Sequence, residues 1–160
     1  MRNINIRKAE AADMNAVHQL IVDLAVYEKA KHEVKTSVET MKVDGFEKNL
    51  FEVLLAEDTE GNALGIALYY YAYSTWKGKM IYLDDLVVNE VYRKQGVGKL
   101  LFDELVKTAL SNNVNQVRWH VLDWNVPAIN FYNKIKANLD HEWIQCKFER
   151  ADLENYQLPK

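Results

Sequence analysis

The first third of the chain passes from an alternating pattern of apolar and polar residues to a helical one. Ile4-Asn5-Ile6-Arg7 has the two-residue period of a half-buried strand. Asp13 precedes apolar residues at positions 14, 17, 20, 21 and 24, a spacing that predicts a helix with Asp13 as its N-cap. Ser37, Thr40 and Met41 predict a second, short helix that ends near Gly45.

From Phe51 onward the pattern is that of strands. Residues 51–57 and 63–73 flank a loop that is rich in turn-forming residues, so they predict a β-hairpin. A second turn leads into a strand over residues 80–88. We therefore expect three consecutive antiparallel strands.

The rest of the chain alternates helices with strands. Residues 97–110 have an apolar helical face, and residues 116–122 predict a strand. Residues 125–138 predict a helix with Pro127 near its first turn, where proline is tolerated. A last strand is expected over residues 143–148. The order predicts one α/β domain over residues 1–160, with helices flanking a central, mixed and mostly antiparallel sheet.

Composition and charge narrow the class of protein. The 160 residues fit one domain, and 49% hydrophobic with 27% charged residues is typical of a globular chain. Twenty Lys plus Arg against 23 Asp plus Glu give a net charge of −3, which argues against a strongly basic nucleic-acid binder. No stretch approaches the length of an apolar membrane span. We expect neither nucleic acid nor membrane as a partner.

The cysteine and histidine residues argue against metal and disulfide chemistry. The single cysteine, Cys146, excludes an intramolecular disulfide and any multi-cysteine metal site. The four histidines lack the spacing of metal ligands, so we expect no metal. The first residues lack the apolar stretch of a signal peptide, and together with the lone cysteine this predicts a cytoplasmic protein.

A glycine-rich junction between a strand and a helix is the first candidate for chemistry. Residues 93–98 read Arg-x-x-Gly-x-Gly, and a helix follows at once. Glycines let a ligand approach the backbone, and free N–H groups at a helix start favour phosphate. Lys94 and Lys99 add positive charge. The spacing is neither a dinucleotide motif nor a P-loop, and a plain strand-to-helix turn explains the glycines equally well.

A second candidate opens the next helix. Residues 124–132 follow a strand directly, so the first turn of this helix can lie beside the glycine loop. Tyr132 could donate a proton, because a phenol has a reference pKa of about 10. Taken alone, Phe131 and Tyr132 are as typical of an apolar core.

Together the two motifs resemble the GNAT superfamily of N-acetyltransferases, over nearly the whole chain in element order. Further patches resemble its diamine (spermidine/spermine) acetyltransferase branch, which includes relatives that act on thialysine. In chain order these patches are Leu24-Ala25-x-Tyr27-Glu28, Asp44-Gly45-Phe46, Tyr69-Tyr70, Trp76-x-Gly78-Lys79, Tyr82-Leu83-x-Asp85 and Asn130-Phe131-Tyr132.

The resemblance implies acetyl-CoA as co-substrate. Its pyrophosphate is expected on backbone amides of the glycine loop, its pantetheine arm along the preceding strand, and the later helix on its other side. The cofactor-binding residues that this implies are Leu86, Val87, Val88, Arg93, Lys94, Gln95, Gly96, Val97, Gly98, Lys99, Asn125, Pro127 and Ala128.

The resemblance also implies the reaction, which is direct acetyl transfer to a primary amine of a small cationic substrate. It implies that this substrate is a diamine, a polyamine or a thialysine-like amino acid, and that the enzyme is a homodimer. Tyr132 matches the residue that protonates the departing thiolate, and Asp84 stands where the branch has a glutamate base. The substrate-binding residues that this implies are Tyr27, Glu28, Trp76, Asp84 and Asp85.

Two departures from the branch keep alternatives open. Asp84 is one methylene shorter than the usual glutamate, so it could act through a water or only bind substrate. Ser74-Thr75 replaces Asp-Pro, which removes one carboxylate and weakens the case for a long polyamine. The alternative functions are acetylation of protein lysines or N-termini, and acyl-CoA binding without catalysis.

Overall fold

The computed structural model describes residues 3–157, which fall into two compact units that divide after His120. The strands of the first unit are β1 (Asn5–Lys8), β2 (Glu52–Glu57), β3 (Ala63–Ser74), β4 (Gly78–Val88) and β5 (Gln116–Arg118). Its α-helices are α1 (Met14–Tyr27), α2 (Val38–Lys42) and α3 (Val97–Ser111), and a π-helical turn (Val43–Glu47) extends α2. The second unit contains α4 (Val126–Lys134) and α5 (Arg150–Asn155).

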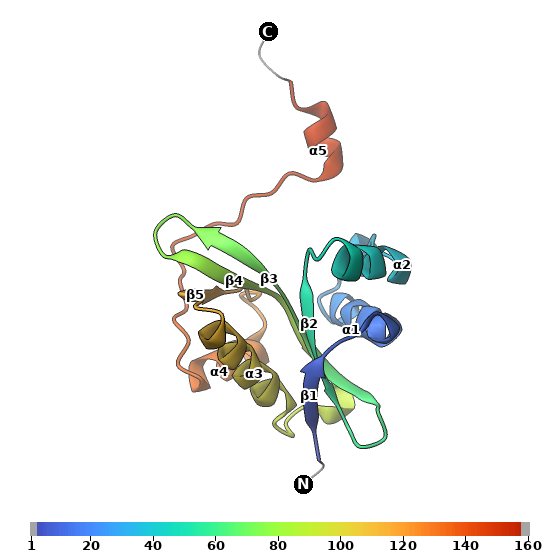
Figure 1. Cartoon of the computed structure of the whole chain (residues 1–160). Helices are drawn as coiled ribbons and strands as arrows, with labels where there is room; N and C mark the ends of the chain where they lie inside the picture. The colour runs from blue at the N-terminus through green and yellow to red at the C-terminus, as the bar shows by residue number, and fades with distance from the viewer. Residues whose placement is uncertain (1–2, 158–160) are drawn as a thin grey trace. The chain divides into compact units, whose positions relative to one another are not determined.

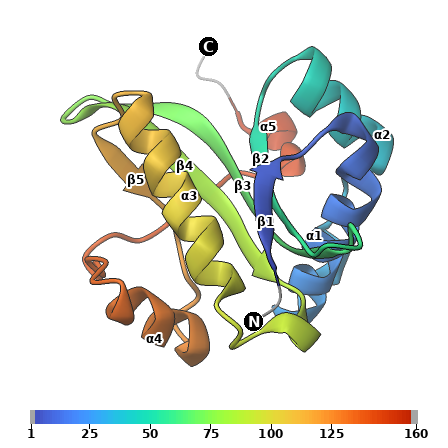
Figure 2. The same cartoon turned by 60° about the horizontal axis from the view of Figure 1, so that its bottom comes forward.

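The first unit is built on one five-stranded sheet in the order β1-β2-β3-β4-β5. Every neighbouring pair is antiparallel except β4 and β5, which are parallel. Helices α1 and α2 cover one face of the sheet and α3 covers the other (Figure 1, Figure 2). The predicted fold class, a mixed and mostly antiparallel sheet flanked by helices, is confirmed.

Apolar side chains fill the space on both faces of this sheet. Helix α3 buries one side chain per turn against its face, namely Val97, Leu101, Leu105 and Ala109. Helix α1 buries its own apolar stripe on the opposite face, namely Met14, Val17 and Leu20. Removing this apolar surface from water is the main force that holds the two helices on the sheet.

A β-bulge at Asp84 changes which way the side chains of β4 point. Leu83 pairs with Tyr69 of β3, and Asp85 pairs with the adjacent Leu68, so Asp84 is an extra residue on β4. The extra residue reverses the alternation of side chains along the strand. Leu83 therefore lies in the core under α3, whereas residue 85 takes the face of α1.

The elements up to α3 are confirmed with small shifts of their ends, but two helix boundaries differ from the prediction. Asp13 does not cap α1 with its side chain; its carboxylate accepts hydrogen bonds from Arg7 (2.7 and 2.9 Å) instead. Ser37 does cap α2, since its Oγ accepts a hydrogen bond from a backbone N–H at 3.1 Å. Gly45 does not end that helix; it lies within the π-helical turn, against the ring of Phe51.

The predicted last strand over residues 143–148 is wrong. These residues form neither helix nor strand, and α5 follows where no helix was predicted. A strand needs a neighbour that pairs its backbone groups, and none pairs with this stretch within residues 3–157. Strand β5 and helix α4 are real but shorter than predicted. No helix of the described chain is both long enough and apolar enough to cross a membrane.

Candidate active site

Three carboxylates predicted to bind substrate come together in the first unit. Asp84 and Asp85 lie at the bulge of β4, and Glu28 directly follows α1. Burial, and then the charges of Asp84 and Glu28, raise the pKa of Asp85 to about 7. Desolvation by the surrounding protein also raises the pKa values of Asp84 and Glu28. We call these three residues the acidic cluster.

The acidic cluster has the chemistry of a binding site for a cation. No ion pair in the described part of the chain involves any of its three carboxylates. Carboxylates that lie close together without a counter-ion repel each other and favour the protonated form. A bound ammonium group relieves this repulsion. A carboxylate with a pKa near neutrality can also accept a proton from it.

Two stacked tyrosine rings lie on the same face of the sheet as Asp85. Tyr70 and Tyr82 are register partners on β3 and β4, with ring centroids 5.2 Å apart and 26° between their planes. The Tyr82 hydroxyl is hydrogen bonded to Nδ1 of His120. Burial, and then the negative charge of Asp84, raise the pKa values of both tyrosines, so the rings and the acids are neighbours. No pattern in the sequence singles out His120, because its contact depends on how β5 aligns with β4.

Tyr27 links the acidic cluster to the glycine loop. It is the last residue of α1 and precedes Glu28. The guanidinium carbon of Arg93 lies 5.2 Å from the centroid of its ring, within the range of a cation–π contact. Arg93 Nε also donates a hydrogen bond to the Val88 carbonyl at 3.2 Å. The end of α1, the end of β4 and the glycine loop are thereby held together.

The glycine loop leaves the start of α3 open to an anion. Lys94 and Gly96 have φ values of 62° and 89°, in the left-handed region that favours glycine. Gly96 is the N-cap of α3, and no side chain caps the helix. The first N–H groups of α3 and its positive dipole end can therefore bind a phosphate. Lys99 forms an ion pair with Asp103 (2.6 Å), and both Lys94 and Lys99 are exposed.

The end of β4 offers an unpaired backbone edge beside this loop. Strand β5 pairs with β4 only over Met80–Tyr82. Within the described chain, residues 83–88 of β4 therefore have a strand partner on the β3 side alone. Leu86, Val87 and Val88, which we predicted to pair with pantetheine, lie on this edge. An extended ligand with amide groups can hydrogen bond there while a phosphate binds at the loop, which are the two kinds of contact that the predicted acetyl-CoA requires.

Four predicted site residues lie on or next to α4 in the second unit. Asn125 caps α4, since its side-chain oxygen accepts a hydrogen bond from the Ala128 N–H at 3.3 Å, and Pro127 lies in the first turn. Tyr132 is buried, and its ring lies edge-on to that of Phe131, with centroids 5.4 Å apart. The predicted start of this helix is confirmed. The catalytic role of Tyr132 stays a prediction.

Trp76 is not brought to the acidic cluster of its own chain. It lies in the turn between β3 and β4 and is 81% exposed. In that turn, Ser74 Oγ accepts hydrogen bonds from the backbone N–H groups of Trp76 (3.3 Å) and Lys77 (3.2 Å). The length of β4 between this turn and Asp85 is roughly 20 Å, well beyond the reach of an indole.

The family to which this arrangement belongs is shown by comparison with known proteins. A family model described as Acetyltransferase (GNAT) family matches residues 15–136, a stretch that contains the acidic cluster, the glycine loop and α4. The chain belongs to the GNAT acetyltransferase family. It is therefore an N-acetyltransferase, and the enzymes of this family use acetyl-CoA.

Individual relatives agree with the family. A thialysine N-epsilon-acetyltransferase from Mus musculus is 37% identical to this GNAT chain, over 93% of the chain and 94% of the mouse protein. The human spermidine/spermine N(1)-acetyltransferase-like protein 1 is 30% identical over 96% of this chain, which matches 24% of that longer protein. An integron cassette protein from the mobile metagenome of V. cholerae has the same fold, with a TM-score of 0.77 at 23% identity over 94% and 95% of the two chains. The resemblance on which the sequence prediction rested is confirmed.

Proposed function

We propose that this N-acetyltransferase transfers the acetyl group of acetyl-CoA directly to a primary amine of a small cationic substrate. The substrate is a diamine, a polyamine or a thialysine-like amino acid. The observation that carries the proposal is the acidic cluster, which lacks a counter-cation in the described chain and is linked through Tyr27 to the glycine loop. The names of the mouse and human relatives support the same class of substrate.

The acidic cluster has to remove a proton before transfer. An alkylamine with a pKa of about 10.4 is neutral in only about one molecule in two thousand at pH 7. We propose that Asp84 and Asp85 together accept the proton that the substrate ammonium loses. The resemblance puts the base at Asp84, whereas the pKa of about 7 belongs to Asp85. Because their charges interact, the two carboxylates titrate as a pair.

Acetyl-CoA supplies an acetyl group that is activated as a thioester. The start of α3 with Lys94 and Lys99 is proposed to hold the pyrophosphate, and the edge of β4 at Leu86, Val87 and Val88 to hold the pantetheine arm. Asn125, Pro127 and Ala128 of the second unit are assigned to the cofactor on the resemblance alone. The neutral amine forms the new carbon–nitrogen bond, the carbon–sulfur bond breaks, and the nitrogen loses one proton, which replaces the proton that the thiolate takes up. Tyr132 is proposed to give the departing thiolate its proton.

A panel of amines tests this function. The protein is incubated with acetyl-CoA and with polyamines, diamines, thialysine, lysine peptides or aminoglycosides, while thiol release is followed. We expect turnover on the small di- or polyamines or on thialysine. The absence of thiol release with every amine would refute the proposal. Calorimetric binding of acetyl-CoA without any turnover would instead support a non-catalytic acyl-CoA-binding protein. Faster turnover on peptides would favour acetylation of protein lysines.

A tyrosine variant tests the proposed acid separately. Tyr132→Phe is expected to lower kcat strongly and to leave the affinity for acetyl-CoA nearly unchanged, because only the hydroxyl group that donates the proton is lost. Phe131→Leu, which alters the neighbouring ring and keeps the phenol, serves as the control. Wild-type turnover in Tyr132→Phe would remove Tyr132 from the mechanism.

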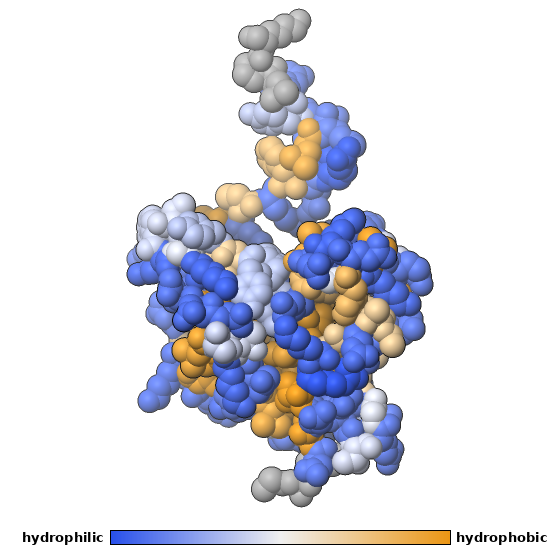
Figure 3. All heavy atoms as spheres, in the orientation of Figure 1, coloured by the Kyte–Doolittle hydropathy of each residue, from blue (hydrophilic) through white to orange (hydrophobic). Residues whose placement is uncertain are grey.

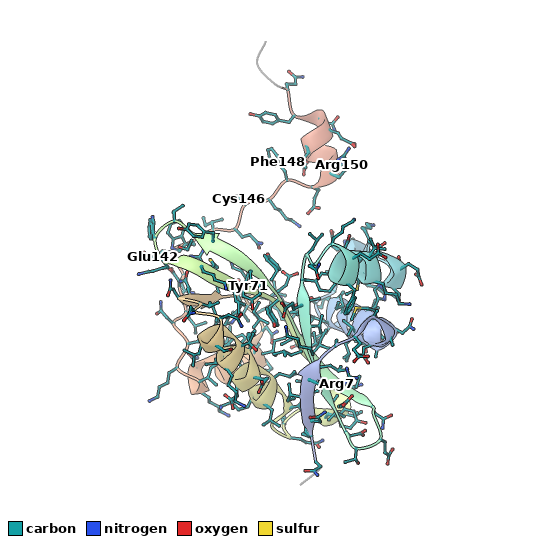
Figure 4. All side chains as sticks on the ribbon, viewed as in Figure 1. Arg7, Tyr71, Glu142, Cys146, Phe148 and Arg150 are labelled. Carbon is teal, nitrogen blue, oxygen red and sulfur yellow. The ribbon has the colours of Figure 1, made fainter. Side chains whose placement is uncertain are left out.

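We also propose that the enzyme is a homodimer and acts in the cytoplasm. Large apolar side chains of the C-terminal stretch are exposed, namely Trp143, Ile144, Phe148, Leu153 and Tyr156. Apolar atoms are visible on the segment that carries α5 (Figure 3), and Phe148 projects from the irregular chain before it (Figure 4). Apolar surface of this kind favours association. A mass of 18.6 kDa by light scattering would contradict the dimer.

The proposed cytoplasmic location rests on the single cysteine.

A further inference from the structure

A cation stands on the same face of the sheet as the acidic cluster. Arg118 is the last residue of β5 and is the register partner of Tyr82. Val117 and Trp119 pack against the core under α3, so by alternation Arg118 and His120 point to the opposite face. The hydrogen bond between Tyr82 and His120 lies on that face. Arg118 is therefore beside the stacked tyrosines, on the strand next to theirs.

Arg118 has no charged partner of its own. Within residues 3–157 its exposed side chain forms neither a hydrogen bond nor an ion pair, whereas its backbone belongs to the ladder between β4 and β5. Its positive charge lowers the pKa of Tyr82, which the charges of Asp84 and Asp85 raise. The phenol of Tyr82 therefore lies within electrostatic range of both the cation and the acids. One aromatic surface has negative charge near one end and an unpaired guanidinium near the other.

The separation of these charges corresponds to a ligand with one cationic and one anionic end. Asp85 lies about 10 Å from Tyr82 along β4, and β5 is about 5 Å further across the sheet. The long Arg118 side chain shortens this gap. An α-amino acid with a lysine-length side chain can reach from the acids to Arg118 and lay its methylenes on the tyrosine rings. A diamine of that length brings an ammonium group toward Arg118 instead, which is repulsive.

We propose that Arg118 determines specificity by binding the α-carboxylate of a diamino-acid substrate whose side-chain amine lies in the acidic cluster. The proposal rests on the function proposed above and names the substrate class within it. A guanidinium suits this task because its planar fork donates two parallel hydrogen bonds to a carboxylate. The contact with His120 fixes the ring of Tyr82, which Tyr70 supports from the other side.

Matched substrate pairs test the role of Arg118. L-Lysine is compared with 1,5-diaminopentane, and thialysine with bis(2-aminoethyl) sulfide; the members of each pair differ only in the carboxylate. Arg118→Gln is expected to lower kcat/KM for the amino acids about 10- to 100-fold, because a charged hydrogen bond is lost. Turnover of the diamines should stay unchanged or rise. Arg118→Lys, which keeps the charge, should retain part of the amino-acid activity.

The control variant is Lys107→Gln, which removes an exposed positive charge from α3, on the opposite face of the sheet. It should leave all four substrates unaffected. Equal losses on amino acids and diamines in Arg118→Gln would overturn the proposal, as would a wild-type enzyme that prefers the diamines. If the wild type acetylates none of them, the proposed function fails, and calorimetric binding of L-lysine still decides the inference. Equal binding by wild type and Arg118→Gln would then refute it.

Discussion

Two groups of carboxylates in the first unit have opposite surroundings. Arg7 on β1 (Figure 4) binds Asp13 at 2.7 Å and Glu57 at 2.9 Å. Hydrogen bonds from Arg7 hold the pKa of Asp13 below its usual value. In the acidic cluster, burial and like charges raise the pKa of Asp85 to about 7.

The difference lies in which partner each group of acids already has. The two carboxylates of the Arg7 group share a cation within the fold, so its hydrogen bonds contribute to stability. The acidic cluster lacks such a partner in the described chain and is costly to ionise, as is typical of functional sites. An aspartate can thus stabilise the structure or prepare it for a cationic ligand, depending on its neighbours.

The largest effect is expected from Asp85→Asn. It should lower kcat/KM for the amine about 100-fold or more, because a proton acceptor and a negative charge are lost from the cluster. Steady-state kinetics measure this, and Asp23→Asn on the exposed side of α1 is the control. Asp84→Asn, assayed in parallel, reports which carboxylate matters more. Wild-type rates in both variants would contradict the assignment of the proton to this pair.

Asp13→Asn should show the opposite behaviour. Loss of its charge-assisted hydrogen bonds to Arg7 is expected to lower the free energy of unfolding by about 2 kcal/mol and Tm by about 5 °C. The kcat/KM of the folded enzyme should not change. Denaturant melts and kinetics on the same preparation measure the two quantities. A variant of normal stability would mean that the ion pair between Arg7 and Glu57 alone maintains the stability of the fold.

The two groups should also respond to pH in opposite directions. The raised pKa of Asp85 means that its contribution to stability is complete below about pH 4 and is lost as pH rises through about 7. Asp85→Asn should therefore gain at least about 1 kcal/mol over wild type at pH 8 and little at pH 4. The lowered pKa of Asp13 means that its contribution is present above its unfolded pKa and is lost on acidification through its folded pKa. Thermal melts of the wild type and of both variants across this pH range measure these contributions. If the contrast did not hold, the stability differences of Asp85→Asn and Asp13→Asn from wild type would change with pH in parallel.

The smallest effect is expected from Glu28→Gln. The charge of Glu28 is the least of the three causes that raise the pKa of Asp85. Its removal should shift the acidic limb of the pH profile of kcat/KM to lower pH by a fraction of a unit. Glu39→Gln on α2 is the control, because this glutamate is exposed and is not among the charges that act on Asp85. An unchanged pH profile of kcat/KM would show that the charge of Glu28 does not influence Asp85.

Much of this site could be predicted because its residues lie at the ends of strongly patterned elements. The strand predicted over residues 80–88 and the helical spacing from Val97 place Asp84, Asp85 and the glycine loop without any tertiary information. The pKa of Asp85 could not be predicted in this way, since it depends on burial and on Glu28, which is distant in sequence.

Other features depend on partners that a local pattern does not specify. Asp13 satisfies the rule for an N-cap, but Arg7 of the neighbouring strand offers its carboxylate stronger hydrogen bonds. The alternation over residues 143–148 describes two faces of a strand and says nothing about an edge to pair with. The contact between Tyr82 and His120 arises only once β5 is aligned with β4.

The bulge at Asp84 also determines which kinds of mutation the site can tolerate. Deleting Asp84 would leave Leu83 opposite Tyr69 and Asp85 opposite Leu68, so the two strands would pair without a bulge and both residues would keep their faces. Such a deletion is expected to spare the fold and to remove one carboxylate from the acidic cluster. Homologous enzymes are therefore expected to tolerate a change of residue count at the bulge better than along the regularly paired part of β4.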